Sequence, residues 1–111
     1  MDIIFEKDKL KEEYNNFKVL VKKYGDKRAK IIRQRLDDLS AAANLEVMRN
    51  LPGRCHELRG DRKWQLSMDA GHPYRLIFMP ANEPVPVKSD GGLDWKQVTV
   101  IKILGVVDTH A

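Results

Sequence analysis

The sequence predicts an α+β fold in which an N-terminal strand and a helical hairpin pack on one face of a small, mostly antiparallel sheet. Apolar residues recur at helical spacing in the first half of the chain and alternate with polar residues in much of the second half. Gly- and Pro-containing turns separate the alternating segments. The 111 residues match the size of a single domain, so we assign 1–111 to one domain.

The first half predicts one strand followed by two helices. Residues 2–5 form a short apolar strand, and a first helix begins near Lys9 and ends at Gly25, which can adopt a left-handed conformation. Asp26 is expected to cap the second helix, and a further helical turn spans 45–50. The buried stripe of the first helix is expected to be Leu10, Tyr14, Phe17, Leu20 or Val21, and Tyr24. That of the second is Ala29, Ile32, Leu36, Leu39 and Ala43.

The second half predicts a meander of strands over residues 55–58, 63–69, 74–79 and 97–104. Gly60-Asp61 and the segment 70–73 supply the first two turns. We expect Trp64, Leu66 and Met68 to share one face of their strand, and 74–79 to lie centrally because it is apolar on both faces. The Pro- and Gly-rich segment 80–95 is too short for a domain and is interpreted as a loop insertion.

Composition excludes several classes of protein. No apolar run approaches the ~18–20 residues that span a bilayer, and the first ten residues are too charged for a signal peptide. The single cysteine, Cys55, excludes an internal disulfide and a multi-cysteine metal site. We therefore expect a cytoplasmic protein with no membrane partner.

Positive charge is concentrated in the first half of the chain. The formal net charge is +4, and the whole excess lies within residues 1–60. Such a surface contacts phosphates in some proteins and is simply a solvated helix face in others, and both interpretations stay open here. Within 18–35, only Asp26 opposes Lys18, Lys22, Lys23, Lys27, Arg28, Lys30, Arg33 and Arg35.

No known catalytic or metal-binding motif is present, so the candidate chemistry rests on histidines and cations. Arg75 interrupts an apolar strand and must reach an anion or solvent, because an unpaired buried charge is prohibitive. His56 could equally cap a strand at the sheet edge, and His72 lies in a turn where exposure is expected. His110 stands next to the last residue, where chains often fray.

One ordered series of residues resembles the HigB-type "killer protein" toxins of the RelE/ParE superfamily. It runs from Leu51-Pro52-Gly53-x-x-His56-x-Leu58-x-Gly60-Asp61-Arg62-x-Trp64-x-Leu66-Ser67 through Tyr74-Arg75-Leu76-Ile77-Phe78 to Asp108-x-His110. The resemblance covers about 28–79 and 97–110, and the 80–95 segment is longer than the family leads us to expect.

The resemblance implies a RelE-like fold and a ribosome-dependent mRNA endonuclease, the toxin of a type II toxin–antitoxin system. It implies a metal-free reaction without cofactors, in which a ribose 2′-hydroxyl attacks the neighbouring phosphate. The implied partners are mRNA on the ribosome, a helix-turn-helix antitoxin, and operator DNA bound only through the antitoxin complex.

The resemblance also implies roles for individual residues. His56 and His110 correspond to acid/base histidines, Asp108 to the acidic residue before the terminal histidine, and Arg75 to an arginine at the scissile phosphate. Basic residues that would bind the flanking backbone are Arg59, Arg62 and Lys63.

One position departs from the family pattern, which often ends Asp-Tyr-His, because Thr109 occupies the middle place here. Threonine cannot stack on a base as tyrosine does. Two alternatives remain open. One is a ParE-like toxin that inhibits DNA gyrase without cleaving nucleic acid, and the other is a catalytically decayed module that binds RNA or an antitoxin.

Overall fold

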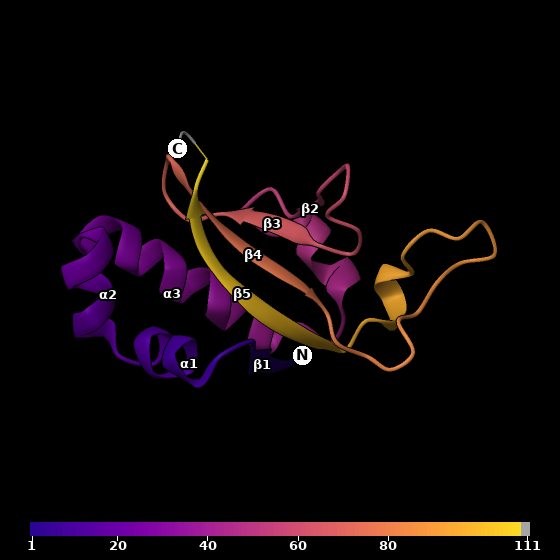
Figure 1. Cartoon of the computed structure of the whole chain (residues 1–111), viewed down its shortest axis with the longest axis horizontal. Coiled ribbons are helices and arrows are strands. Elements are labelled where there is room, and N and C mark those ends of the chain that lie inside the picture. Colours follow the sequence, from indigo (N-terminus) through magenta and orange to yellow (C-terminus); the bar gives the residue numbers. More distant parts are fainter. Residues whose placement is uncertain (110–111) are drawn as a thin grey trace.

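A five-stranded sheet in the order β1-β5-β4-β3-β2 forms the centre of the computed structural model, which describes residues 1–109 (Figure 1). β1 pairs parallel with β5, and the other neighbouring strands are antiparallel. The elements are β1 Asp2–Phe5, α1 Asp8–Tyr14, α2 Phe17–Tyr24, α3 Asp26–Ala41, η1 Leu45–Asn50, β2 His56–Glu57, β3 Leu66–Asp69, β4 Tyr74–Pro80, η2 Trp95–Gln97 and β5 Val100–Asp108.

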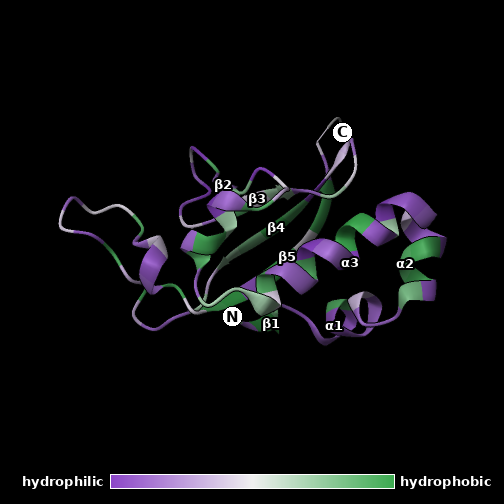
Figure 2. Cartoon of the chain, turned by 180° about the vertical axis from the view of Figure 1, so that it is seen from behind, coloured by the Kyte–Doolittle hydropathy of each residue, from purple (hydrophilic) through white to green (hydrophobic). Residues whose placement is uncertain are grey.

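The helices lie on one face of the sheet, with α3 running along it and α1 and α2 beyond α3 (Figure 2). Two aromatic contacts help to bind this layer: the rings of Tyr24 and Tyr74 lie edge to face at 5.4 Å, and those of Phe5 and Tyr14 are tilted to each other at 6.1 Å. The structure therefore confirms the predicted α+β class, with helices on one face of a mostly antiparallel sheet.

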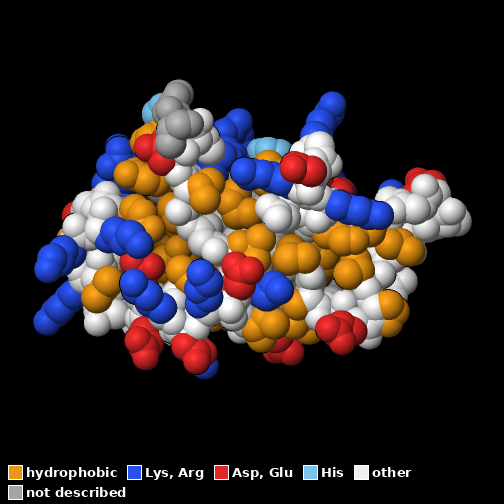
Figure 3. All heavy atoms as spheres, viewed as in Figure 1, with side chains coloured by type: hydrophobic (Ala, Val, Ile, Leu, Met, Phe, Trp, Pro, Cys, Tyr) orange, Lys and Arg blue, Asp and Glu red, His pale blue; other side chains and the backbone are white. Residues whose placement is uncertain are grey.

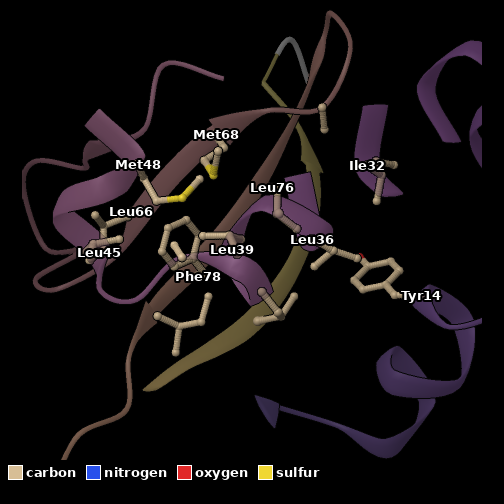
Figure 4. Packing of buried hydrophobic residues seen from close by; sticks show 14 of the residues in the cluster. Tyr14, Ile32, Leu36, Leu39, Leu45, Met48, Leu66, Met68, Leu76 and Phe78 are labelled. Carbon is tan, nitrogen blue, oxygen red and sulfur yellow. The ribbon is translucent and has the colours of Figure 1, made fainter. Parts of the chain in front are cut away.

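The core lies between α3 and the sheet. Figure 4 shows Ile32, Leu36 and Leu39 of α3 facing Leu76 and Phe78 of β4, and each is no more than 1% exposed. Burying a side chain of this size contributes about 1.5–3 kcal/mol. β3 and η1 extend the same cluster with Leu66, Met68, Leu45 and Met48.

The N-terminal helices differ from the prediction in three ways. The single helix expected over 9–24 is broken at Asn15-Asn16, where the Asn16 side chain accepts a hydrogen bond from the Val19 amide (3.4 Å) and begins α2. Because of this break, Phe17 is 39% exposed rather than buried. Gly25 rather than Asp26 occupies the N-cap of α3, and the Asp26 carboxylate pairs with Lys30 at 3.1 Å.

The second helix ends earlier than predicted. It stops at Ala41, so the chain turns and buries Ala42 in place of the expected Ala43, which is exposed. The predicted helical turn over 45–50 is present as η1.

The predicted strands are present, but they begin and end at other residues than predicted. Trp64 lies outside β3 with a φ of +68°, a left-handed conformation that cannot continue the pleat, so it does not share a strand face with Leu66. β5 begins at Val100 because 95–97 form η2, and it continues past Gly105 to Asp108. Gly105, at φ +145°, lies at an irregularity in the β4–β5 register that lets the strand continue. β4 is central, as predicted.

The segment after β4 leaves the sheet and returns to it. Its tip contains a bridge between Val87 and Leu93, and the Lys88 amide donates to the Gly92 carbonyl at 2.8 Å. Leu93 and Trp95 at its end are buried in the core. No helix in residues 1–109 is long and apolar enough to cross a membrane.

Candidate active site

Arg75 is held on the sheet surface by two side chains of the neighbouring strand. The register pairs Arg75 of β4 with Asp69 of β3, and strand alternation places Ser67 on the same face. Arg75 Nη1 donates to Asp69 Oδ1, and Arg75 Nε donates to Ser67 Oγ. Arg75 was predicted to reach an anion or solvent, and it reaches an anion, Asp69, with its own side chain only 15% exposed.

The exposed side chain of Arg54 binds the same carboxylate of Asp69. Its Nε donates to Asp69 Oδ2 at 2.8 Å and its Nη2 to Asp69 Oδ1 at 2.9 Å, a bidentate pair. These bonds from Arg54, and the charge of Arg75, hold the pKa of Asp69 below its ordinary value. The backbone is fixed as well, because the Asp69 amide donates to the Gly53 carbonyl at 2.8 Å.

His56 lies beside this cluster at the start of β2. Its Nδ1 is 2.7 Å from the Arg54 carbonyl and 3.5 Å from Arg75 Nη2. A carbonyl oxygen only accepts hydrogen bonds, so the short contact to Arg54 assigns a proton to Nδ1. The neutral imidazole then keeps its lone pair on Nε2, the nitrogen that is left to exchange a proton with a bound molecule.

A pocket of about 340 Å³ opens next to the arginines, between α3 and the β3–β4 turn. Arg35 of α3 borders it and donates from Nε to the Asp69 carbonyl at 2.9 Å. Thr109 also lines the pocket, and its amide and hydroxyl both donate to the Pro73 carbonyl, at 3.0 and 2.9 Å. Arg54 and Arg75 also line the pocket, so its polar wall is largely cationic.

The predicted backbone-binding cations, Arg59, Arg62 and Lys63, lie in the loop between β2 and β3 and are exposed. Lys63 Nζ lies 4.8 Å from the centre of the Trp64 ring. Figure 3 shows Lys and Arg side chains together with a histidine over the β2–β3 region. His72 is exposed, as expected.

Asp108 ends β5 on the other face of the sheet. The register pairs it with Tyr74 and pairs Val107 with Arg75, so strand alternation turns the side chains of Asp108 and Arg75 to opposite faces. His110 lies outside the described residues. The structure therefore brings His56 and Arg75 together and leaves Asp108 on a separate face.

Three members of this cluster were not predicted as site residues: Asp69, Arg54 and Ser67, the last of which lies in the series that resembles HigB-type toxins. A hairpin register centred on His72 would have paired Asp69 with Arg75, because each lies three residues from it. No register predicts the position of Arg54, because it lies in the irregular segment 51–55 before β2 and has a φ of +51°. Among residues 1–109, no group of three or more His, Cys, Asp or Glu side chains is arranged to hold a metal ion.

No family model matches this sequence, and no curated protein matches it either. A solved structure described as a YoeB/ParE toxin from Agrobacterium tumefaciens is similar in fold, with a TM-score of 0.56. The alignment covers 97% of this chain and 98% of that chain at 8% sequence identity. At that identity the likeness shows the fold alone, over almost the whole length of both chains.

Proposed function

We propose that this chain is the toxin of a type II toxin–antitoxin system and cleaves mRNA on the ribosome. The observation that carries the proposal is the approach of Arg75 Nη2 to within 3.5 Å of the His56 ring. A fixed guanidinium beside an imidazole provides charge stabilisation and proton transfer at one place. The shared fold with a structure named as a YoeB/ParE toxin and the resemblance to HigB-type toxins support the same class.

The proposed reaction is a metal-free transesterification. The ribose 2′-oxygen loses its proton and attacks the adjacent phosphorus, and the bond from phosphorus to the 5′-oxygen breaks. That oxygen takes up a proton, leaving a 2′,3′-cyclic phosphate and a 5′-hydroxyl. Arg75, with Nε and Nη1 held by Ser67 and Asp69, offers Nη2 to the charge that develops on the phosphate.

Proton transfer is assigned to two histidines. His56 uses Nε2 for one of the two transfers, and His110 supplies the second imidazole, with Asp108 orienting it. This role for Asp108 does not require it to touch the phosphate, in keeping with its place on the face opposite Arg75. The Thr109 hydroxyl is engaged with the Pro73 carbonyl, so we assign it no catalytic role. Arg59, Arg62 and Lys63 bind the flanking RNA backbone.

The partners follow from this function. We propose a helix-turn-helix antitoxin that holds the toxin inactive, a complex that binds its own operator DNA through the antitoxin, and a cytoplasmic location. Purification of the chain alone at high yield from unharmed cells would count against the antitoxin.

The test is to induce the chain in bacteria and map the 5′ ends of cellular mRNA. His56→Ala, Arg75→Ala and His110→Ala are compared with Lys88→Ala, an exposed cation on the distant tip of 80–95. Growth arrest with codon-phased cuts that disappear in the first three variants, but persist in the fourth, is the expected result. Circular dichroism confirms that each variant is folded.

Two other outcomes would replace the proposal. Growth arrest that survives all three changes, accompanied by supercoiling defects, would indicate a gyrase-inhibiting toxin. No arrest by the unaltered chain would indicate a decayed module that binds RNA or an antitoxin.

A further inference from the structure

The end of the 80–95 segment is bonded to the strand that carries His56. Trp95 Nε1 donates to Glu57 Oε2 at 2.9 Å, across 38 positions of sequence. Trp95 is 4% exposed, whereas Glu57 is exposed at the edge of the sheet. A buried indole N–H usually requires an acceptor, and here the acceptor is the residue next to His56.

Trp95 is itself firmly placed. The Arg49 guanidinium carbon lies 3.8 Å from the centre of the Trp95 ring, and Arg49 Nε bonds to Glu46 at 3.0 Å. Leu93, 3% exposed, packs into the same core cluster. The indole is therefore a rigid point of attachment rather than part of the exposed tip around Val87, which is 52% exposed.

Without the hydrogen bond from Trp95 to Glu57, β2 would be held in the sheet by few contacts. It has two residues, lies at the edge of the sheet and, within residues 1–109, pairs with β3 alone. Beyond it the Leu58 amide donates to the Gln65 carbonyl at 2.9 Å, and the chain then enters an exposed loop. Short edge strands open readily, so an additional bond to the core restricts the position of the backbone at His56.

We propose that Trp95 is a positioning residue that fixes His56 through the hydrogen bond from its indole to Glu57. The value of this arrangement for cleavage rests on the proposed function, since a catalytic group displaced by 1 Å can lose about 100-fold in rate. In this proposal the end of the 80–95 segment at Trp95 positions a site residue, whereas the exposed tip around Val87 does not.

Three variants separate the hydrogen bond from the charge of Glu57. Trp95→Phe removes the donor and keeps both the charge and a ring beneath Arg49. Glu57→Gln keeps an acceptor and removes the charge, and Glu57→Ala removes both. Val87→Ala, on the exposed tip of the same segment, is the matched control.

Cleavage of a defined mRNA on purified ribosomes is measured for each variant. Trp95→Phe and Glu57→Ala are expected to lower kcat about tenfold with little change in KM, because geometry and not binding is lost. Glu57→Gln and Val87→Ala are expected to stay near the unaltered rate. Loss in both Glu57 variants but not in Trp95→Phe would assign the effect to charge and overturn the proposal.

A second measurement does not depend on cleavage. NMR of the free protein gives the hydrogen-exchange rate of the Leu58 amide and the signals of the His56 ring. Trp95→Phe is expected to accelerate exchange at Leu58 and to shift the His56 signals, while Val87→Ala leaves both unchanged. If the unaltered chain cleaves nothing, the proposed function fails, and these signals alone decide the positioning of His56. Unchanged signals in Trp95→Phe would overturn it.

Discussion

At the scale of single residues, Asp69 organises the candidate site by accepting bonds from two arginines. Its carboxylate orients Arg75 and Arg54, and its backbone carbonyl accepts from Arg35. Paired in this way, the largely buried Arg75 avoids the cost of an isolated charge, yet one guanidinium nitrogen remains directed toward His56. The same contacts that stabilise the fold therefore set the direction of the proposed catalytic cation.

Asp69 also predicts a dependence of stability on pH. The bonds from Arg54, followed by the charge of Arg75, lower the folded-state pKa of Asp69 below its ordinary 3.8. The stabilisation is thus fully present above about pH 4 and is lost as pH falls through the lowered pKa. Asp69→Asn is expected to have a lower free energy of unfolding than the unaltered chain at pH 7. This difference is expected to become smaller at acidic pH, where Asp69 of the unaltered chain is itself protonated.

Urea unfolding at pH 7 and near pH 3 measures both differences. Glu12→Gln, which removes an exposed carboxylate, serves as the control and is expected to change stability little at either pH. A deficit in Asp69→Asn that is equally large at both pH values would refute the role of the ionised carboxylate.

Cys55 gives a second prediction at this scale. Burial raises the pKa of its thiol to about 12, despite the opposing charges of Arg49 and Arg75. Since the thiolate is the reactive form, iodoacetamide at pH 8 is expected to alkylate Cys55 much more slowly in the native chain than in denaturant. Mass spectrometry follows the reaction, and equal rates in the two states would show that the thiol is accessible and ionisable.

At the scale of elements, Gly53 lies between η1 and β2, where an added side chain would have to displace the side chains of Met68 and Arg35. Its φ is +121°, and an added Cβ would lie 2.8 Å from Met68 Cε and 2.9 Å from Arg35 Nε. Gly53→Ala is therefore expected to destabilise the fold by about 1–3 kcal/mol and to push Arg35 away from the Asp69 carbonyl.

Gly91→Ala separates the effect of the positive φ from the effect of crowding against Met68 and Arg35. Gly91 also has a positive φ, of +88°, but an added Cβ would meet no atom of residues 1–109 within 4 Å. Urea unfolding is expected to show a clearly larger loss for Gly53→Ala than for Gly91→Ala. Equal losses would mean that backbone strain alone is responsible and that Arg35 is not displaced.

The elements also show what the sequence can predict. α3 and β4 were predictable because period and burial agree over their whole length, as at Ile32 and Phe78. The break between α1 and α2 was not, because the apolar spacing continues through Asn15-Asn16 and a local capping bond decides the outcome. The prediction that Trp64 belongs to β3 was wrong for a similar reason, since alternation in the sequence does not reveal a residue in the left-handed conformation.

The candidate site was predictable only where the chemistry is carried by one residue. Arg75 stood out as a cation in an apolar strand, and its need for an anion is a physical requirement. Its partner required the register of β3 and β4, and Arg54 required the path of an irregular segment. The resemblance singled out His56, but the proton on Nδ1 follows only from the distance to the Arg54 carbonyl.

At the scale of the whole molecule, the structure divides the basic run of 18–35 into two groups. Its arginines are used internally: Arg28 bonds to the His72 carbonyl, Arg33 to the Tyr14 carbonyl and Arg35 to the Asp69 carbonyl. In contrast, the lysines that are exposed and form no ion pair among residues 1–109 are Lys18, Lys22 and Lys27. Figure 3 shows Lys and Arg side chains projecting at the end of the molecule where α2 lies.

This division predicts how binding to RNA depends on salt. If the three lysines contact phosphates, each lost contact is expected to reduce the slope of log affinity against log salt by about 0.7 for single-stranded RNA. Changing Lys18, Lys22 and Lys27 to Gln together is therefore expected to weaken binding strongly at low salt and only slightly at high salt. Fluorescence anisotropy with a labelled RNA measures the slope.

The matched control changes Lys88, Lys96 and Lys102 to Gln, which alters the net charge equally at positions away from α2 and α3. A smaller change of slope in the control would assign RNA contact to the helical surface, distant in sequence from the His56 strand. The same change in both triple variants would mean that net charge alone attracts RNA, and the lysines of α2 and α3 would then be a solvated helix face.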